Sequence, residues 1–423
     1  MFNALYTLVA TLALPFALVR LILRSFNEPG YRDDVRQRLG FFGHISAQPT
    51  LWIHAVSAGE TRASASLIAA LSDRYPAHRI LLTQMTATGR QAAIELYGDA
   101  VTLCWLPWDL PWAQKRFLRT WKPGCCILME TEIWPNLIRA CVADEIPIVL
   151  ANARLSERSA RRYGRVPSFA RQIISSIHLV LAQTDADALR FRTLGAVTVR
   201  TTGNLKFDVP PPSMQIAEGR RWRAALGKRQ TVLLASTRDG EELLLLRALH
   251  VVLQPETLIL LVPRHPQRFD AVATLVQALG LSLERRSSGR FPERDTQVWL
   301  GDTMGEMISW YALADLAVIG GSWLPLGGQN LIEACAAACP VIVGPHTFNF
   351  EQVAIDAINA GAAVRAQDPN EAAQQASILL AASERLKTMG EAALAFANAH
   401  RGATALTLDM IDALIHDDSG GKR

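Results

Sequence analysis

The strongest constraint on the fold is a regular alternation of apolar runs and amphipathic segments that begins near residue 50. Segments of helical length, such as SASLIAALSDRY (64–75) and DADALRFRTLG (185–195), separate most of the apolar runs. Strands that alternate with helices form right-handed βαβ units, which build a parallel sheet with helices on both faces. We therefore predict an α/β fold. The strand-like runs of the first half are LWIHAV (51–56), RILLTQ (79–84), VTLCWL (101–106), CCILME (125–130), IPIVLAN (146–152), LVLAQT (179–184) and VTVRTTG (197–203).

The alternation is interrupted once, at VPPPSM (209–214), because a proline cluster can continue neither a helix nor a central strand. A chain of 423 residues also exceeds one ordinary hydrophobic core. We predict one domain over 25–208, a linker over 209–219 and a second domain over 220–423. A ligand that touches both domains would bind in a cleft between them, and the Ala-rich helical stretch from about Ser383 can pack back on the first domain. The strand-like runs of the second half are TVLLAST (231–237), LILLVPR (258–264), TQVWLGD (296–302), DLAVIGG (315–321) and PVIVGP (340–345).

The N-terminal segment 1–24 differs from the rest of the chain. It carries no charge from Ala4 to Val19, and with the apolar residues that follow it reaches about 20 residues, roughly the length of a membrane span. No basic residue precedes it and no A-x-A site follows it, so a cleaved signal peptide fits poorly. We predict a single N-terminal membrane anchor with the body in the cytoplasm, and leave open whether it spans the bilayer or lies in its interface. The arginines that support this orientation are Arg20, Arg24, Arg32, Arg36 and Arg38.

Composition and motifs exclude several classes of protein. The net charge of +4 is mild and no nucleic-acid recognition motif occurs, so no nucleic-acid partner is expected. The six cysteines form no C-x-x-C pair, so we expect neither a metal site nor disulfides. The chain also lacks G-x-G-x-x-G, G-x-x-x-x-G-K-[ST] and G-x-S-x-G, which weakens an oxidoreductase, a P-loop NTPase and an α/β-hydrolase. No cofactor is predicted.

Glycine pairs at the end of a strand in the second half favour a nucleotide-sugar site. In GGSWLPLGGQNLIEA (320–334) a strand ends in glycine, and a second glycine pair leads to a predicted helix near Asn330. Such glycines let the backbone approach a phosphate, which a helix start stabilises, and Glu333 can accept hydrogen bonds from ribose hydroxyls. An ordinary strand-to-helix loop would look similar. Arg264 and the segment Met304-Gly305-Glu306 follow other strands and are expected at the same sheet edge.

One carboxylate, Glu60 in HAVSAGETR (54–62), admits two interpretations. Ser57-Ala58-Gly59-Glu60 fits the S-x-x-E capping box, in which Glu60 is structural. Glu60 also follows a strand, where open α/β sheets bind ligands, so it is a candidate general base. A helix start should favour its charged form. Gly59 lowers the stability of such a helix by up to about 1 kcal/mol relative to Ala. A glycine at this position is explained if substrate must come close to the backbone.

Further polar residues follow other strands of the first half. Glu130 ends CCILME and Glu132 follows two residues later, and both are either site carboxylates or ordinary acids ahead of a helix. An arginine-rich stretch is either a solvated helix face or a surface for anionic lipid or acceptor phosphates. Its members are Arg154, Arg158, Arg161, Arg162 and Arg165.

The chain resembles a known family over residues 1 to about 365. The resemblance rests on motifs that occur in order and at compatible spacing: HAVSAGE, TGR (88–90), LPWDLP, ETEIWPN, NARLSERS, GNLKFD, PRHPQRF, GDTMGE and GGQNLIEA…GPHTFNF. These motifs are similar to those of bacterial 3-deoxy-D-manno-octulosonic acid (Kdo) transferases. The chain departs from the common pattern at Gln329 and Arg238, where the family usually has His.

The resemblance implies a GT-B glycosyltransferase fold and a function. It implies inverting transfer of Kdo from CMP-Kdo to the lipid A precursor lipid IVA at the cytoplasmic face of the bacterial inner membrane. It also implies Glu60 as the base, with Glu130 and Lys206 stabilising the transition state. The residues that would hold CMP are Pro263, Arg264, Met304, Gly305, Glu306, Asn330, Leu331, Ile332 and Glu333.

Three alternatives stay open at the level of sequence. Another membrane-associated nucleotide-sugar glycosyltransferase or a nucleotide-sugar epimerase would use the same fold, although an epimerase has little use for an anchor. A membrane-tethered nucleotide-sugar sensor would keep the 320–352 loop but would not need Glu60.

Overall fold

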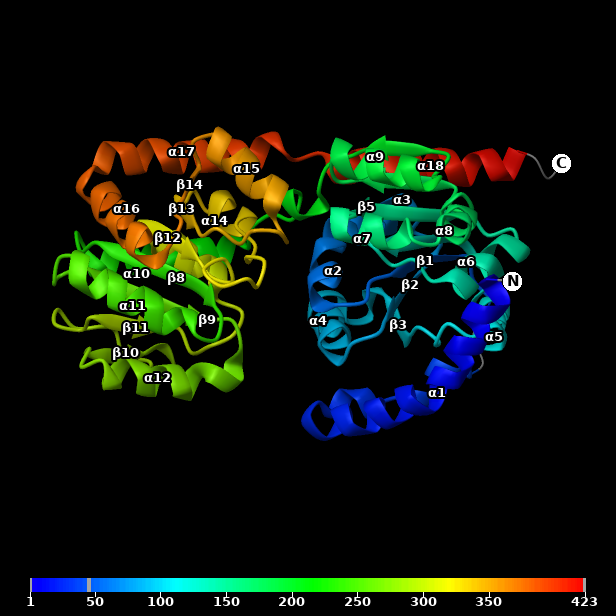
Figure 1. The fold of residues 1–423 in the computed structure, drawn as a ribbon, viewed down its shortest axis with the longest axis horizontal. Coiled ribbons are helices and arrows are strands. Elements are labelled where there is room, and N and C mark those ends of the chain that lie inside the picture. Colours follow the sequence, from blue (N-terminus) through cyan, green and yellow to red (C-terminus); the bar gives the residue numbers. More distant parts are fainter. Residues whose placement is uncertain (1, 44–46, 421–423) are drawn as a thin grey trace. The chain divides into compact units, whose positions relative to one another are not determined.

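The structure is a computed structural model that describes residues 2–43 and 47–420. It comprises two compact units, the first formed by residues up to Val209 together with those from His400 on, and the second by Pro210–Ala399. Each unit is built around one parallel sheet (Figure 1). Residues 213–219, which the sequence placed in the linker, form the first half of helix α10 (Ser213–Leu226).

The first unit contains a seven-stranded sheet in the order β3-β2-β1-β4-β5-β6-β7. Strands β1 and β5 are buried along their whole length, as expected for strands covered on both faces. Side chains alternate between two cores: Trp52 packs in a cluster with Phe117, whereas its neighbours Leu51 and Ile53 enter the opposite cluster. The strands are β1 (Thr50–His54), β2 (Arg79–Gln84), β3 (Thr102–Trp105), β4 (Pro123–Met129), β5 (Ile148–Ala153), β6 (Leu179–Ala182) and β7 (Val199–Thr201).

Helices cover both faces of this sheet (Figure 1). Helix α5 illustrates why they form: Pro111 occupies its first turn, and Ala113, Phe117 and Trp121 recur at helical spacing on its buried side. The helices of the unit are α1 (Phe2–Asn27), α2 (Ala58–Ala63), α3 (Ala65–Arg74), α4 (Ala87–Tyr97), α5 (Pro111–Trp121), α6 (Pro135–Ala143), α7 (Glu157–Tyr163), α8 (Pro167–Ile174), α9 (Asp185–Leu194) and α18 (Ala403–Gly420).

The second unit repeats the architecture with strand order β10-β11-β9-β8-β12-β13-β14. The sequence missed its two edge strands, which have only three residues each. The strands are β8 (Thr231–Thr237), β9 (Leu258–Pro263), β10 (Leu283–Arg285), β11 (Val298–Leu300), β12 (Leu316–Ile319), β13 (Val341–Val343) and β14 (Ala363–Arg365). The helices are α10, α11 (Glu241–Val252), α12 (Phe269–Ala278), α13 (Met307–Leu313), α14 (Ile332–Ala336), α15 (Glu351–Asn359), α16 (Pro369–Ala381) and α17 (Ser383–Ala399).

The sequence assigned the helical stretch from about Ser383 to the second domain but allowed it to pack back on the first. In the structure α17 belongs to the second unit and α18 packs on the first. The buried carboxylate of Asp412 accepts hydrogen bonds from Arg74 Nε at 2.8 Å and from the hydroxyl of Tyr75. Ile411 is fully buried in the same core as Leu51 and Ile53. Asp208, close to the end of the first segment of the unit, accepts hydrogen bonds from the backbone N–H groups of Gly402 and Thr404. These bonds join the end of the unit's first segment to the start of its second segment.

Candidate active site

Two loops of the first unit that carry carboxylates follow β1 and β4, the strands between which the strand order of the sheet reverses. Connections from β1 lead to β2 and β3, whereas those from β4 lead to β5, β6 and β7, and the two strands are paired, with His54 opposite Leu128. Doubly wound sheets bind ligands at the carboxyl ends of strands at such a switch point. Glu60 follows β1 and Glu130 follows β4, so the topology brings both predicted residues to this edge.

The Glu60 carboxylate is held by the loop that precedes its helix. Oε2 accepts a hydrogen bond from the Val56 N–H at 2.8 Å, and Oε1 accepts one from the Ser57 hydroxyl at 2.8 Å. Ser57 Oγ in turn accepts the Glu60 N–H at 3.4 Å, which caps α2. The predicted capping role of Ser57 is confirmed, but the carboxylate bonds to Val56, one residue before the position that a capping box uses.

The pKa of Glu60 is raised to about 7. Burial is the main cause, since only 9% of the residue is exposed, and the negative charges of Glu132 and Glu130 add to it. Hydrogen bonds from Val56 and Ser57 oppose the shift. Burial and the two neighbouring carboxylates thus favour the neutral form of Glu60, opposite to the effect expected of a helix start. A pKa near neutral suits a general base.

The surroundings of Gly59 do not require glycine. A Cβ atom at this position would meet only Ser57 Oγ, at 3.8 Å, and the backbone is in an ordinary conformation. A side chain larger than hydrogen is therefore tolerated at Gly59, beside the Ser57 hydroxyl that holds the Glu60 carboxylate.

Glu130 is paired with the third predicted catalytic residue. Lys206 Nζ lies 3.0 Å from Glu130 Oε1, and about a fifth of each side chain is exposed. Lys206 belongs to a short 3-10 helix (Leu205–Phe207), and the side-chain oxygen of Asn152 accepts the Leu205 N–H at 3.1 Å. Glu130 and Asn152 both have left-handed backbone conformations, with φ of 55° and 53°. Such conformations cost on the order of 1 kcal/mol in non-glycine residues and concentrate at functional sites. Sequence reasoning missed Asn152.

Glu132 lies near the same edge. Its Oε2 accepts a hydrogen bond from Trp134 Nε1 at 2.8 Å. Burial and the charge of Glu130 raise the pKa of Glu132, while the Trp134 bond opposes this. Glu132 therefore acts on Glu60 through its charge, and its carboxylate is engaged by a tryptophan.

The second unit has its own switch point between β8 and β12. Gly320, which follows β12, comes so close to the end of β8 that a Cβ would lie 2.5 Å from the Ser236 oxygen. Arg264 follows β9 at the same edge; its N–H donates to the Thr237 oxygen at 2.9 Å and its side chain is exposed. Gly320 is thus required by strand packing, and with Arg264 it lies at the carboxyl ends of the strands, where doubly wound sheets generally bind ligands.

The segment Asn330–Glu333 differs from the predicted helix start. Helix α14 begins at Ile332, two residues later than expected, and has only five residues. Asn330 bonds to the Ile332 N–H and to Glu333 Oε1, both at 3.1 Å. The side chains of Leu331 and Ile332 are buried, so these two residues can offer only backbone groups to a ligand.

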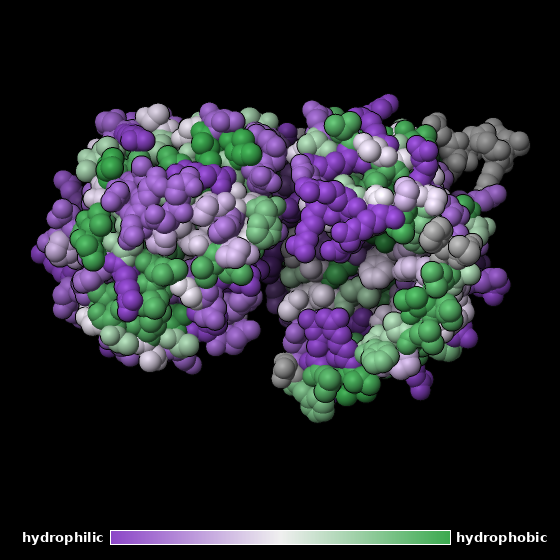
Figure 2. All heavy atoms as spheres, in the orientation of Figure 1, coloured by the Kyte–Doolittle hydropathy of each residue, from purple (hydrophilic) through white to green (hydrophobic). Residues whose placement is uncertain are grey.

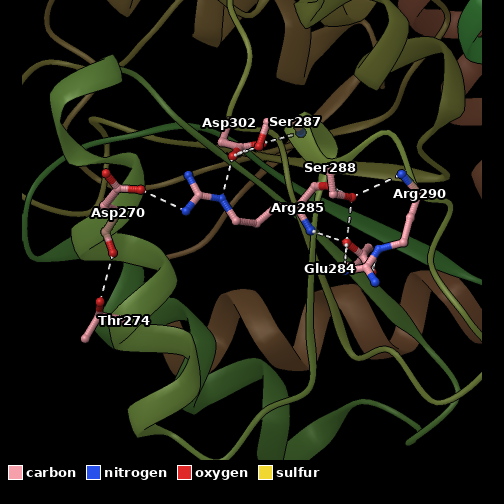
Figure 3. A network of polar contacts seen from close by, with 8 residues as sticks. All are labelled: Asp270, Thr274, Glu284, Arg285, Ser287, Ser288, Arg290 and Asp302. Atoms are coloured by element: carbon pink, nitrogen blue, oxygen red, sulfur yellow. Dashed lines mark hydrogen bonds and ion pairs between the residues drawn. The ribbon is translucent and has the colours of Figure 1, made fainter.

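The loop Asp302–Glu306 is held by polar contacts with the segment Arg285–Ser287, at the end of β10 (Figure 3). Asp302 accepts Arg285 Nε at 2.6 Å and the Ser287 N–H at 2.8 Å. Burial opposes ionisation of Asp302, but the hydrogen bonds from Ser287 and Arg285 lower its pKa overall. Glu306 is bonded to Arg286 at 2.9 Å and to the Thr303 hydroxyl. This leaves Met304 exposed at the tip of the loop, next to Gly305 with φ 83°.

Two fully buried carboxylates at the start of α11 were missed from the sequence. Glu241 accepts hydrogen bonds from three backbone N–H groups, those of Arg238 (2.8 Å), Gly321 (2.7 Å) and Trp323 (3.0 Å). It therefore clamps the loop after β8 to the loop after β12. Glu242 is bonded to Thr237 and Arg268. Two adjacent acids at the start of an otherwise apolar helix were the available signal.

The same edge is electropositive. Burial lowers the pKa of His265, and the charges of Arg238, Arg264 and Arg268 lower it further. Arg268 pairs with Glu242 and Asp239, and the cluster of arginines at this edge would favour an anionic ligand.

Comparison with known proteins agrees with this geometry. A family model described as 3-deoxy-D-manno-octulosonic-acid transferase (kdotransferase) matches residues 33–209. The 3-deoxy-D-manno-octulosonic acid transferase of Bordetella pertussis is 48% identical over 374 residues, which cover 86% of this chain and 86% of that protein. The chain belongs to the Kdo transferase family. The Kdo transferase of Haemophilus influenzae is 36% identical over 419 residues, 97% of this chain and 98% of that protein.

Solved structures confirm the predicted fold of this Kdo transferase. The Anabaena protein Alr3699/HepE in complex with UDP superposes with a TM-score of 0.61 at 15% identity, covering 86% of this chain and 99% of that one. A Listeria monocytogenes protein described as a putative UDP-N-acetylglucosamine 2-epimerase gives 0.60 at 14%, covering 88% and 98%. Two Rossmann-like units of the GT-B type, preceded by one apolar helix, are therefore established. The same fold occurs in a protein described as a putative epimerase, so the fold alone does not decide the activity. The sequence relatives do, and they identify a glycosyltransferase that transfers Kdo.

Proposed function

We propose that the chain transfers Kdo from CMP-Kdo to lipid IVA at the cytoplasmic face of the bacterial inner membrane, with Glu60 as general base. The observation that carries the proposal is the Glu60 carboxylate, buried at a sheet switch point and held by Val56 and Ser57, with a pKa raised to about 7. A hydroxyl of the acceptor attacks the anomeric carbon of Kdo and gives its proton to Glu60. The bond from that carbon to the phosphate oxygen breaks, and CMP leaves with the electron pair.

The other residues have distinct parts in this proposal. The Glu130–Lys206 pair places one positive and one negative charge at the same edge as Glu60, where Lys206 can offset charge that develops during transfer. In the second unit, Arg264 and Arg238 supply positive charge for the phosphate and the Kdo carboxylate. The nucleoside would be met by Asn330 and Glu333, which are hydrogen-bonded to each other at 3.1 Å, and by the backbone of Leu331 and Ile332.

The location follows from the first helix. Residues Asn3–Phe26 are long and apolar enough to cross a membrane, and only 6% of the most apolar stretch is buried. A lipid acceptor would be met at the membrane surface, so a membrane-bound helix would bring the enzyme to its acceptor. A soluble acceptor would not require such a helix.

The test is an assay with both substrates. Purified full-length protein is incubated with CMP-Kdo and lipid IVA, and the lipid is analysed by mass spectrometry. The proposal predicts that the lipid gains the mass of one or more Kdo residues and that CMP is released in equal number. Release of CMP without any gain in lipid mass would contradict the assignment of lipid IVA as the acceptor. CMP-Kdo that stays unreacted with every lipid tested would contradict its assignment as the donor.

A further inference from the structure

Helix α1 has two different faces along its whole length. Residues that are half-buried or buried recur every three or four positions: Asn3, Tyr6, Thr7, Ala10, Leu14, Leu18, Leu21 and Ser25. The large apolar residues on the other face are exposed by more than half: Leu5, Leu8, Val9, Leu12, Phe16, Val19, Ile22, Leu23 and Phe26. This spacing puts the two sets on opposite sides of one helix. Hydrophobic residues (green) are seen along α1 in Figure 2.

The N-terminal end of the inner face is bound to the first unit by polar contacts. Tyr6 donates a hydrogen bond to Asp109 at 2.9 Å, and Thr7 donates one to the Asn136 side chain at 3.0 Å. Asn3 donates to Gln172 at 3.3 Å. These three partners precede or belong to different helices of the same unit, α5, α6 and α8, so the first two turns of α1 lie against its globular body.

The C-terminal end of α1 is held to the same unit. Arg24 donates to the Tyr31 hydroxyl at 3.2 Å, and Arg32 donates to the Ser25 hydroxyl at 3.0 Å. Tyr31 is buried and stacks on Trp105 of β3, with ring centroids 6.3 Å apart. Both ends of the helix therefore touch one folded unit.

A helix that crosses a bilayer cannot keep both ends on a body that lies on one side. The 26 residues of α1 extend about 39 Å at 1.5 Å per residue, which exceeds the hydrocarbon thickness of roughly 30 Å. Contacts at residues 3 to 7 and again at residues 24 and 25 thus place the helix alongside the unit. The polar residues at the two ends of the inner face, such as Asn3, Thr7 and Ser25, would also be poorly matched by lipid.

We propose that α1 is a monotopic anchor, which lies in the plane of the membrane interface with its outer face in the lipid and its inner face on the first unit. The partner is a bilayer with anionic headgroups, because the exposed Arg20, Arg24 and Arg32 border the apolar face. The inference rests on the membrane location in the proposed function but not on the donor or acceptor.

The contact also reaches the carboxylate edge. Asp109, which binds Tyr6, accepts hydrogen bonds from the backbone N–H groups of Asn136 (3.0 Å) and Leu137 (2.7 Å) at the start of α6. Helix α6 follows the loop that carries Glu130 and Glu132. An in-plane helix therefore holds this loop at a set depth relative to the lipid surface.

The test uses two full-length variants, Asn3→Cys and Arg294→Cys, the second being an exposed position in the second unit. The six native cysteines are buried, so a membrane-impermeant maleimide applied to sealed spheroplasts of a bacterial host reads only the introduced thiols. Denaturing detergent gives the total signal.

The in-plane helix predicts that the protein sediments with membranes and that neither introduced thiol reacts until the membrane is opened. Reaction of Asn3→Cys in sealed spheroplasts, with Arg294→Cys still protected, would show a spanning helix and overturn the proposal. Recovery of the protein in the soluble fraction would overturn the membrane location on which it rests.

Discussion

The hydroxyl of Ser57 donates a 2.8 Å hydrogen bond to the carboxylate of Glu60 and accepts the backbone N–H of the same residue at 3.4 Å. Capping the helix and orienting the carboxylate are therefore one arrangement. The structural and the catalytic role of Glu60 do not exclude each other, because the hydrogen bonds at the start of α2 also orient the carboxylate towards the end of β1.

Removal of the Ser57 hydroxyl separates these two effects. Ser57→Ala should lower the free energy of unfolding by about 1 kcal/mol through loss of the cap. It should also raise the pKa of Glu60 further, because the hydroxyl bond lowers it, so the acidic limb of the rate profile moves to higher pH. Urea unfolding and kcat/KM against pH measure the two effects. Ser57→Thr keeps a hydroxyl and serves as control; an acidic limb that stays in place in Ser57→Ala would contradict this role.

Gly59→Ala should affect stability and activity in opposite directions. Alanine fits the available space and favours a helix by up to about 1 kcal/mol, so the unfolding free energy should rise. If substrate approaches the backbone at Gly59, as the sequence predicts, the added methyl group should lower activity. Thermal unfolding and steady-state kinetics check this. Unchanged activity in the stabilised variant would show that no substrate approaches here.

The Glu130–Lys206 pair should act as a unit in catalysis. Because both side chains are largely buried, Glu130→Gln and Lys206→Met should each reduce kcat, and the double variant should lose little more than the worse single one. The exposed pair Glu157–Arg161 is a matched control, with a coupling expected below about 0.5 kcal/mol. Independent, additive losses at Glu130 and Lys206 would argue against a shared role.

Glu241 should govern donor binding from a buried position. Glu241→Gln replaces a carboxylate oxygen by an amide N–H that faces backbone donors, at a cost of about 1–3 kcal/mol in stability. The loops after β8 and β12 should loosen, so the KM for CMP-Kdo should rise more than kcat falls. Glu391→Gln changes an exposed acid of α17 in the same unit and should leave both constants unchanged. A variant that loses stability while its donor KM stays normal would limit Glu241 to a structural role.

Much of the fold follows from local sequence patterns. The run RILLTQ coincides with β2, and CCILME overlaps β4 up to Met129, because buried parallel strands are apolar along their whole length. The short edge strands β10 and β14 were missed, since three partly buried residues carry no periodicity. The sequence allowed the C-terminal helices to pack back on the first unit, but it could not say that only α18 does so, because an apolar helix face does not reveal which core it joins.

The site could be predicted only in part. Strand ends identified Glu60, Glu130 and Arg264 because parallel strands bring their carboxyl ends to one edge. The raised pKa of Glu60 could not be predicted, since it depends on burial in the folded unit and on carboxylates about 70 residues away in the sequence. The Glu241 clamp likewise joins loops that are distant in sequence.

The pH dependence of kcat/KM in wild type and Glu60→Gln tests the central claim most directly. A carboxylate must be ionised to accept a proton, and the pKa of Glu60 is about 7, so wild-type kcat/KM should be full above pH 7 and fall about tenfold per pH unit well below it. Glu60→Gln should lose roughly 10²- to 10⁴-fold, as expected for a general base, and its residual rate should lack this limb while CMP-Kdo still binds. A Glu60→Gln enzyme with wild-type kcat/KM, or with the same acidic limb, would contradict the assignment of Glu60 as the base.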